Sequence, residues 1–404
     1  MGEILFLSHR IPFPPDRGDK IRSHYLLKAL ANRARVHVAT FGETDADMAA
    51  KSELADIAAS HFLVRRSKPL PRAGMEALLN HKPVSLTAFD HPRMRSWVAH
   101  VLRIRPIDTI FVFSGQMGQY IPADFTGRVV VDLCDVDSAK FDAYGERGGA
   151  RAVIDRREGR LLKLEEERLA HRADTTILIS ENEADLLRSR MKRPADATIV
   201  AMRNGIDTAT FDPDKVASHP ALAGTGPHLV FTGQMDYPPN VDAALRTIDS
   251  LLPAIRRDHP DATFHCVGRA PVAALTTRDG REGVRVWGEV LDVKPFLAGA
   301  DIVLAPLTIA RGIQNKVLEA MAMARPVVLS PEAATGIDAK DGEHFAIAPT
   351  DKAFVDQVND LLANEGRRRH MAASARRFVV REQGWNAMLA PLSEILESDF
   401  RDAA

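Results

Sequence analysis

One stretch in the last third of the sequence restricts the fold more than any other. It begins with a short apolar run, Asp301–Pro306, continues through a loop that contains Gly312, and enters a helix expected near Ile313. Pro326 ends that helix, and a second apolar run follows at Val327–Leu329. Short apolar runs of this kind are typical of strands buried in a parallel sheet, so the stretch predicts one strand–loop–helix–strand unit.

The start of this helix has the properties of a phosphate-binding site. Its first backbone N–H groups have no partner within the helix, and Gly312 lets a ligand approach them closely. Lys316, in the first turn, can cancel the charge of a diphosphate. Glu319 follows within one turn and can accept hydrogen bonds from the vicinal hydroxyls of a ribose. The alternatives are an ordinary surface lysine and an ordinary exposed helix glutamate.

The overall composition indicates a globular protein. The chain has 404 residues, enough for two or three domains, of which 45 % are hydrophobic and 26 % charged. A net charge of −1 gives no general attraction for nucleic acid, so no nucleic-acid partner is expected. Cys134 and Cys266 cannot form a disulfide scaffold and lie in apolar runs, which favours buried thiols in a reduced, cytoplasmic setting. We expect neither a signal peptide nor a membrane-spanning helix.

Short apolar runs recur along the chain in two sets, which predict two sheets. The first set is Ile4–Ser8, Val36–Thr40, Phe62–Arg65, Thr109–Phe113, Val129–Leu133, Thr175–Ser180 and Ala197–Met202. The second set is Leu229–Gly233, Thr263–Gly268, Val284–Gly288, Asp301–Pro306, Pro326–Ser330 and His344–Ala348. We therefore predict an α/β fold of two Rossmann-like domains whose parallel sheets face an interdomain cleft.

The expected domain bounds follow from composition and helical spacing. Residues 1–207 form the first domain, and residues 208–227, rich in Pro, Gly, Ala and Asp, form a linker. Residues 228–383 form the second domain. Residues 384–404 contain a last helix, near Trp385–Phe400, that we expect to return to the first domain. The Gly-x-Gly-x-x-Gly fingerprint is absent, which disfavours a dehydrogenase.

Residues suited to ligand binding follow several of the predicted strands. In the second domain, glycines follow four strands, which suggests a backbone kept open for a ligand: Gly233, Gly268, Gly288 and Gly312. In the first domain, Asp132, Asp135 and Asp137 cluster at the end of a buried strand, where their mutual repulsion favours a functional role. They could bind a metal or orient a hydroxyl group, and helix capping is the alternative.

Residues 61–105 are unusually basic for a nearly neutral chain. They hold nine Lys and Arg residues and two acidic residues, a local net charge of +7, with aliphatic and aromatic residues interleaved. Such a surface can dock on anionic lipid, and a solvated helical face is the alternative.

Several segments together resemble the GT-B-type retaining glycosyltransferases of group 1, also described as family 4-like. Val200-Ala-Met-Arg-Asn-Gly-Ile-Asp207 is similar to the stretch at that family's interdomain junction, and Lys316-Val-Leu-Glu-Ala-Met-Ala322 is similar to its nucleotide-binding helix. The resemblance covers nearly the whole chain. Within the family, the chain looks like the sugar transferases of the PEP-CTERM/exosortase exopolysaccharide system, through four segments: His9–Lys20, Val131–Ser138, Gly233–Asn240 and Arg311–Glu319.

The resemblance implies roles for individual residues. Glu319 would hold the ribose, Gly312 and Ile313 would offer N–H groups to the diphosphate, and Val290 would meet the base through its main chain. Gly18 would let the first domain's loop approach the phosphate or the acceptor, and Asp135 would lie beside the position, here Cys134, where many relatives have histidine. The same segments supply the other candidate substrate-binding residues: Asp19, Lys20, Asp137, Asn240, Arg311, Gln314 and Asn315.

Three departures from the family pattern concern charge and backbone freedom. Arg311 stands where many relatives have the first of two glutamates eight positions apart. Gln234 stands where many have a diphosphate-binding arginine, and Pro239-Asn240 occupies the region of a lysine. The first-domain loop has one glycine rather than two. Lys316 and Arg311 are the candidates for the missing cation.

The resemblance implies transfer of a sugar from a nucleoside-diphosphate sugar to a lipid-linked or oligosaccharide acceptor, with retention of configuration and without a metal or cofactor. We expect the chain in the cytoplasm, or peripherally on the inner face of the plasma membrane through residues 61–105. Two alternatives remain open: a non-catalytic protein that binds nucleotide-sugars or glycans, and a nucleotide-sugar epimerase of the same architecture.

Overall fold

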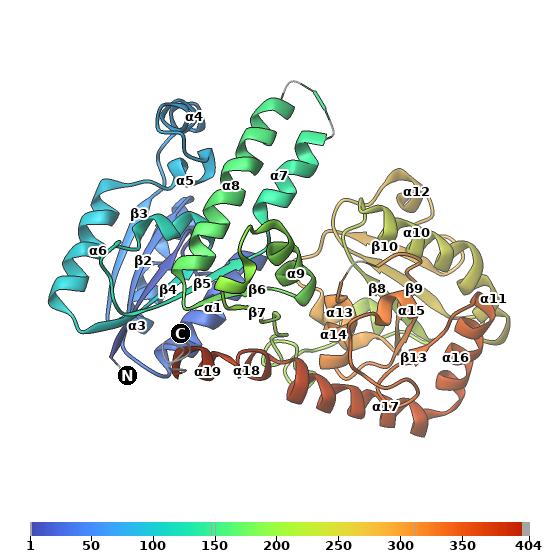
Figure 1. Ribbon diagram of the computed structural model, residues 1–404. Helices are drawn as coiled ribbons and strands as arrows, with labels where there is room; N and C mark the ends of the chain where they lie inside the picture. Colours follow the sequence, from blue (N-terminus) through green and yellow to red (C-terminus); the bar gives the residue numbers. More distant parts are fainter. Residues whose placement is uncertain (1, 147, 150, 311, 398–404) are drawn as a thin grey trace. The chain divides into compact units, whose positions relative to one another are not determined.

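The computed structural model describes residues 2–146, 148–149, 151–310 and 312–397. It divides into two compact units, one formed by Met1–Asn204 with Met388–Ala404 and the other by Gly205–Ala387. Each unit contains one parallel sheet with helices around it, as Figure 1 shows. The prediction of an α/β fold with two parallel sheets is therefore confirmed.

The first unit is built on a seven-stranded parallel sheet in the order β3-β2-β1-β4-β5-β6-β7. Its strands are β1 (Glu3–Ser8), β2 (Val36–Gly42), β3 (Ser60–Arg65), β4 (Ile107–Phe113), β5 (Arg128–Cys134), β6 (Thr175–Leu178) and β7 (Ile199–Ala201). All seven residues of β2 and five of the six of β1 are buried, which explains why these strands are apolar without alternation.

The helices of the first unit follow the strands in chain order. They are α1 (Gly18–Ala31), α2 (Asp45–Ala49), α3 (Lys51–Ile57), α4 (Leu70–Leu79), α5 (Val84–Ala88), α6 (Pro92–Ile104), α7 (Asp137–Glu146), α8 (Ala152–Arg172), α9 (Glu181–Arg190) and α19 (Leu392–Glu397). Short 3₁₀ turns occur at Gly115–Tyr120 and Pro194–Asp196.

The second unit is built on a six-stranded parallel sheet in the order β10-β9-β8-β11-β12-β13. Its strands are β8 (His228–Thr232), β9 (Thr263–Val267), β10 (Val284–Gly288), β11 (Ile302–Ala305), β12 (Val327–Leu329) and β13 (Ala346–Ile347). Its helices are α10 (Pro238–Arg246), α11 (Leu252–Asp258), α12 (Ala273–Thr276), α13 (Lys294–Gly299), α14 (Asn315–Ala322), α15 (Pro331–Ala334), α16 (Asp351–Ala363) and α17 (Glu365–Phe378). A 3₁₀ turn at Pro220–Leu222 and π-helical turns at Thr247–Leu251 and Val379–Gln383 complete it.

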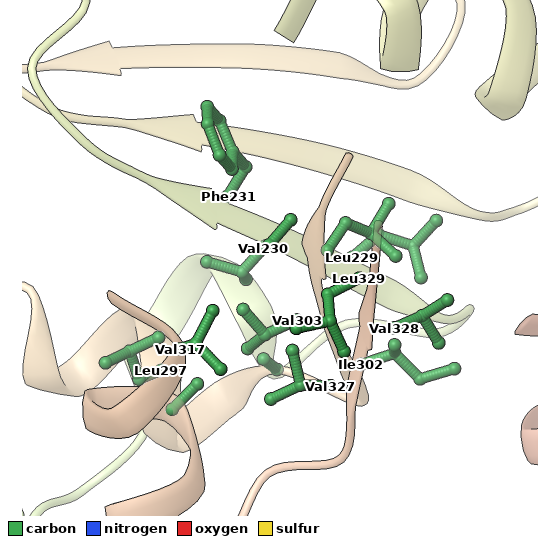
Figure 2. Close-up of a cluster of buried hydrophobic side chains, with 14 of the residues drawn as sticks. Leu229, Val230, Phe231, Leu297, Ile302, Val303, Val317, Val327, Val328 and Leu329 are labelled. Carbon is green, nitrogen blue, oxygen red and sulfur yellow. The ribbon is translucent and has the colours of Figure 1, made fainter. Parts of the chain in front are cut away.

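Helix α14 is held against this sheet by its apolar side. Val317 and Leu318 are buried in the core of the second unit. Figure 2 shows Val317 together with Leu297 of α13 and the side chains of β8, β11 and β12. Because neighbouring residues of a helix point in different directions, burial of Val317 and Leu318 fixes the directions of Lys316 and Glu319.

The segment expected to be a linker belongs to the second unit. Arg376 of α17 donates a hydrogen bond of 2.9 Å to the backbone oxygen of Phe211 and forms an ion pair of 2.9 Å with Asp212. A composition rich in Pro and Gly predicts irregular backbone, but it does not show whether distant side chains hold that backbone in place.

The C-terminal segment differs from the single helix expected near Trp385–Phe400. It contains two short helices, α18 (Trp385–Met388) and α19, and residues 398–404 lie outside the described residues. Pro391 separates the two helices, because proline lacks the N–H that a continuous helix needs. Within the first unit, α19 accepts hydrogen bonds from Arg33 at Ser393 Oγ (2.7 Å) and from Arg128 at the Ile395 oxygen (3.0 Å).

Candidate functional site

The strand order of the second sheet marks one edge as the place for a ligand. The chain leaves β8 toward β9 on one side and later returns to β11 on the other, so the order reverses between β8 and β11. In open parallel sheets ligands bind outside the carboxyl ends of strands at such a reversal. The segments at this position are the loop after β8 with the first turn of α10, which contains Asn240, and the loop that precedes α14.

Lys316 extends from α14 toward the end of β8. Its ammonium donates a hydrogen bond of 2.5 Å to Asn240 Oδ1 and lies 4.6 Å from the centre of the Phe231 ring. Asn240 in turn donates from Nδ2 to the backbone oxygen of Gln234, at 2.9 Å. The amide of Asn240 is thereby fixed with its oxygen toward the lysine, and the ammonium is held at the carboxyl end of β8.

Burial alters the charge properties of Lys316 and Glu319. Removal from water lowers the pKa of Lys316 to about 8, an effect that the nearby Glu319 carboxylate opposes. Burial raises the pKa of Glu319, and Lys316 opposes that rise. A lysine partly withdrawn from water and held beside a strand end is poised to bind an anion, because an anion would restore the favourable surroundings of its charge.

At two of the four glycines of this edge, Gly233 and Gly268, close packing leaves no room for a Cβ atom. A Cβ atom on Gly233 would lie 2.8 Å from the Asn240 amide and 3.0 Å from Lys316 Nζ. A Cβ on Gly268, whose φ is +154°, would lie 1.6 Å from the Gly233 oxygen. These glycines therefore let the ends of β8 and β9 and the lysine come together.

The other two glycines do border open space. Gly312 has a φ of +72° and no atom within 4 Å of a built Cβ, and Gly288 has a φ of +68° with its nearest neighbour 4.0 Å away. Gly312 is exposed and lies three residues before α14. Both positions favour glycine because of their left-handed backbone.

The N-terminus of α14 has no side-chain cap. Its N-cap residue, Gln314, makes no capping hydrogen bond and instead donates from Nε2 to the Gly312 oxygen at 3.0 Å. Ile313 is partly buried and Asn315, the first residue of the helix, is exposed. Arg311, one of the two candidates for the missing cation, lies outside the described residues. The helix begins two residues later than the sequence predicts, which leaves Gly312 and Ile313 in the loop.

Arg269 belongs to this edge but was not among the predicted site residues. It follows Gly268 at the end of β9 and donates a hydrogen bond of 2.8 Å to Gln234 Oε1. A guanidinium therefore lies against Gln234, the residue that stands in place of the family's arginine. The sequence contained a signal for it, since Arg269 directly follows a strand end, but the side-chain contact between two loops could not be predicted.

Val290 follows β10, an edge strand of the second sheet. It is partly buried against the core of the second unit. Its side chain therefore points at least partly inward, which is compatible with a role exercised through its main chain.

The aspartates of the first unit do not form one cluster of equivalent carboxylates. Asp132 is completely buried and pairs with Arg22, whose Nε donates to Asp132 Oδ2 at 2.8 Å. Asp135 is exposed, and Asp137 begins α7. Burial raises the pKa of Asp137, and the neighbouring Asp135 carboxylate raises it further, against the opposing effect of Lys140. Only Asp135 and Asp137 remain candidates for contact with a substrate.

Lys20 has a structural partner in place of the expected ligand contact. Its side chain is buried and forms an ion pair of 2.6 Å with Asp47, with the Phe13 oxygen a further acceptor at 3.4 Å. The ammonium therefore anchors the proline-rich loop that leads into α1. Gly18, at the start of α1, has no atom within 4 Å of a built Cβ, so its surroundings are open as expected.

Asp19 is the centre of a charged group at the start of α1. Arg10 and Arg17 form ion pairs with it at 2.6 and 2.8 Å, and His9 Nε2 lies 3.3 Å away. Burial alone would raise the pKa of Asp19, but its hydrogen bonds with His9 and Arg10 hold the pKa well below its usual range. His9 and Arg10 directly follow β1, beside β4, where the order of the first sheet reverses. Both belong to the His9–Lys20 segment, but neither was among the predicted site residues.

The described residues contain neither a candidate metal site nor a candidate membrane-spanning helix. No three of their His, Cys, Asp or Glu side chains are arranged to hold a metal ion. In the same part of the chain, no helix is both long and apolar enough to cross a membrane.

In a comparison with known proteins, the family match falls within the second unit. Residues 226–364 match the family model described as "Glycosyl transferases group 1". Phosphatidyl-myo-inositol mannosyltransferase of Mycobacterium leprae is 28 % identical over 225 residues, which cover 53 % of this chain and 58 % of the mannosyltransferase. The enzyme of the same name from Propionibacterium freudenreichii is 28 % identical over 163 residues, 40 % of this chain and 39 % of its own length. These alignments thus span less than two thirds of the relatives.

Solved structures resemble the chain over nearly its full length. Anabaena HepE in complex with UDP has a TM-score of 0.61 at 16 % identity, covering 98 % of this chain and 99 % of its own. Sucrose-phosphate synthase from Thermosynechococcus elongatus has a TM-score of 0.59 at 16 % identity, covering 98 % of both chains. At such low identity the likeness shows the fold. Residues 226–364 thus match the group 1 glycosyltransferase family model, in a chain that has the GT-B fold.

Proposed function

We propose that the chain is a retaining glycosyltransferase that moves a sugar from a nucleoside-diphosphate sugar to an acceptor. The observation that carries this proposal is the start of α14, where an uncapped helix N-terminus, Lys316 and Glu319 lie at the reversal point of the second sheet. The family match over residues 226–364 supports it, as do the complexes of Anabaena HepE with UDP and with UDP-glucose.

The donor is held by residues of the second unit. The N–H groups of Gly312, Ile313 and the first turn of α14 bind the diphosphate, and Lys316 supplies a positive charge beside it. Glu319 accepts hydrogen bonds from the ribose hydroxyls, and the main chain of Val290 meets the base. Arg269 lies on Gln234 and supplies a second positive charge, in place of the arginine that many relatives have there.

The reaction breaks the bond between the anomeric carbon and the diphosphate oxygen. The acceptor oxygen attacks the same face of the sugar that the diphosphate leaves, and the acceptor proton passes to the departing diphosphate oxygen. This front-face route retains configuration without an enzyme nucleophile. Lys316 and the helix N-terminus stabilise the negative charge that develops on the leaving group, so we propose that no metal or other cofactor is required. Asp135 of the first unit orients the acceptor hydroxyl.

The first unit takes the acceptor, which we propose is a lipid-linked glycan of exopolysaccharide biosynthesis. Two observations support a lipid carrier. The curated relatives are named phosphatidyl-myo-inositol mannosyltransferases, and residues 61–105 carry a local net charge of +7. We therefore place the chain in the cytoplasm, at the inner face of the plasma membrane.

A non-catalytic protein that binds nucleotide-sugars is the second candidate. It is favoured by Arg311, which stands where many relatives have a glutamate, and by Gln234, which is neutral where many have a cation. The contact of Arg269 with Gln234 argues against this candidate, because it places a guanidinium beside the neutral side chain. An epimerase would act on the donor without an acceptor, and product analysis after incubation with the donor alone distinguishes it.

A panel of nucleotide-sugars tests the proposal. We expect one nucleoside-diphosphate sugar, or its free nucleoside diphosphate, to raise the melting temperature by mass action, by an amount that grows with ligand concentration. Glu319→Gln is expected to lose most of this stabilisation for ribonucleotides but to bind the 2′,3′-dideoxyribose analogue as the wild type does. Turnover is then measured with the stabilising donor and a polyprenyl-linked acceptor. If no donor raised the melting temperature, the proposal would be wrong. Stabilisation without turnover would favour the non-catalytic alternative.

A further inference from the structure

The first unit carries an exposed apolar helix face that its own fold does not cover. Helix α4 contacts the unit through Ala73 and Ala77, which are completely buried. Four large apolar side chains of the helix have high exposed fractions: Leu70 (64 %), at its start, and Met75 (61 %), Leu78 (61 %) and Leu79 (76 %), on the side away from the two alanines. Figure 1 shows α4 at the periphery of the first unit. Four such side chains on one short helix exceed the scattered exposed residues of an ordinary surface.

A cationic cavity lies beside the N-terminal end of this helix. It has a volume of about 770 Å³ and is lined by Arg66, Lys68, Arg72, His91, Arg95 and a single carboxylate, Asp90. Lys68 and Pro69 directly precede α4, and Arg72 lies in its first turn, so the cavity adjoins the N-terminal turn of this helix.

The positive charge around this cavity is only partly neutralised. Glu76 is shared by Lys68 and Arg72, at 2.7 and 2.8 Å. Glu43 is likewise shared by Arg66 and by Arg10, at 2.7 and 2.9 Å. Arg95 is paired with Asp90 at 2.7 Å. Because Glu76 and Glu43 each face two cations, a small excess of positive charge remains among these groups for an external anion.

The remaining basic residues of 61–105 are distributed differently. Arg103 and Arg105 lie at the C-terminal end of α6, beyond Ala99, the last residue of that helix that lines the cavity, by roughly 6 and 9 Å at the helical rise of 1.5 Å per residue. Arg105 is also bound to Glu3 at 2.8 Å. The structure thus concentrates the excess charge where it adjoins the apolar face of α4.

We propose that this surface, α4 with the adjoining cationic cavity, docks on an anionic phospholipid membrane. The leucines and methionine of α4 enter the interface between headgroups and acyl chains, and the cavity takes the phosphate of a lipid headgroup. The combination of an apolar face with a cationic cavity favours a lipid surface over a free phosphate, which would need the cavity alone. The inference rests on the proposed function, because a membrane is where the chain would meet a lipid-linked acceptor.

Vesicle co-sedimentation of the full chain tests this docking. We expect binding to vesicles of phosphatidylcholine with phosphatidylglycerol, little binding to phosphatidylcholine alone, and weakening with salt. Leu78→Asp with Leu79→Asp is expected to lower the affinity for anionic vesicles about tenfold or more. Arg72→Glu with Arg95→Glu is expected to have an effect of about tenfold or more at low salt, since each basic residue near the surface contributes about fivefold.

Matched controls separate these effects from general changes of surface. Val153→Asp alters an equally exposed apolar residue of α8, 73 % exposed, and should bind as the wild type does. Arg257→Glu with Arg281→Glu makes the same charge change in an arginine-lined cavity of the second unit and should have little effect. Wild-type affinity in the α4 variant, or equal losses in the controls, would overturn the proposal. If inorganic phosphate abolished vesicle binding and the α4 substitutions did not change it, the cavity would be a site for free phosphate instead.

The docking and the proposed function fail in distinguishable ways. Stabilisation by the donor is measured without vesicles, and the α4 variant should retain it in full. If the donor stabilises the wild type but anionic vesicles do not bind it, only the docking proposal is wrong. If no donor stabilises the wild type, the proposed function is wrong whatever the vesicles show.

Discussion

Replacing Lys316 by alanine is expected to lower kcat for sugar transfer by about 10²–10³-fold, the loss found when one fixed donor to a developing oxyanion is removed. The leaving diphosphate gains negative charge in the transition state, and Lys316 is the described ammonium held at the strand end by Asn240. Steady-state kinetics with the accepted donor measure the effect. Lys340→Ala, at an exposed lysine elsewhere in the second unit, is the control and should leave kcat unchanged.

The pH dependence of the Lys316 effect has a defined sign. Because burial lowers the pKa of Lys316 to about 8, the charged form is lost as pH rises through 8, and kcat/KM should fall about tenfold per pH unit above that value. The free energy of unfolding should instead rise with pH. Between pH 8 and the ordinary lysine pKa of 10.5, the unfolded chain binds a proton at Lys316 that the folded chain without ligand does not bind. Lys316→Arg stays charged and should lose the alkaline fall in kcat/KM. An alkaline fall that persists in Lys316→Arg would mean that another group titrates.

Replacing Gly268 by alanine is expected to destabilise the second unit by about 3 kcal/mol or more, which corresponds to a fall of roughly 10 °C in melting temperature. The new Cβ would lie 1.6 Å from the Gly233 oxygen, and that oxygen belongs to the backbone, so neither strand end can yield without moving the other. Distortion there would also move the backbone that Asn240 and Lys316 contact.

Gly312→Ala is the matched control for Gly268→Ala. Its φ of +72° is also unfavourable for alanine, but no atom lies within 4 Å of the new Cβ, so only about 1 kcal/mol of backbone strain is expected. Thermal denaturation followed by circular dichroism compares the two. Equal melting temperatures for the two variants would show that the close approach of Gly268 to Gly233 does not hold in solution.

The fold was predictable from the sequence because parallel strands buried on both faces leave a strong local signal. Runs such as Ile4–Ser8 and Leu229–Gly233 are apolar without alternation, and the structure places each in the centre of a sheet. Helix ends were less predictable. Helix α14 begins at Asn315 rather than near Ile313, since Gly312 and the contact of Gln314 with its oxygen extend the loop.

The candidate site was predictable only where a residue's role depends on its immediate neighbours in the chain. Lys316 and Glu319 could be chosen because both lie on one helix start. Lys20 and Asp132 could not be judged, because their partners, Asp47 and Arg22, lie 27 and 110 residues away along the chain. Such ion pairs between distant segments turn a charged residue from a ligand contact into a structural one.

Glycines and arginines at the strand ends show the same limit. The sequence shows that glycines follow several strands, but only the structure separates Gly268, which is crowded by backbone, from Gly312, which borders open space. Arg269 was missed because its importance lies in a contact with Gln234 on another loop.

Hydrogen exchange with and without UDP tests most directly whether the carboxyl edge of the second sheet binds a nucleoside diphosphate. The account predicts slower amide exchange on addition of UDP in two segments of the full chain, residues 233–240 and 312–319, and a smaller effect in Lys316→Ala. Unchanged exchange in both segments, with protection elsewhere such as the arginine-lined cavity of Arg256, Arg257 and Arg278, would contradict it.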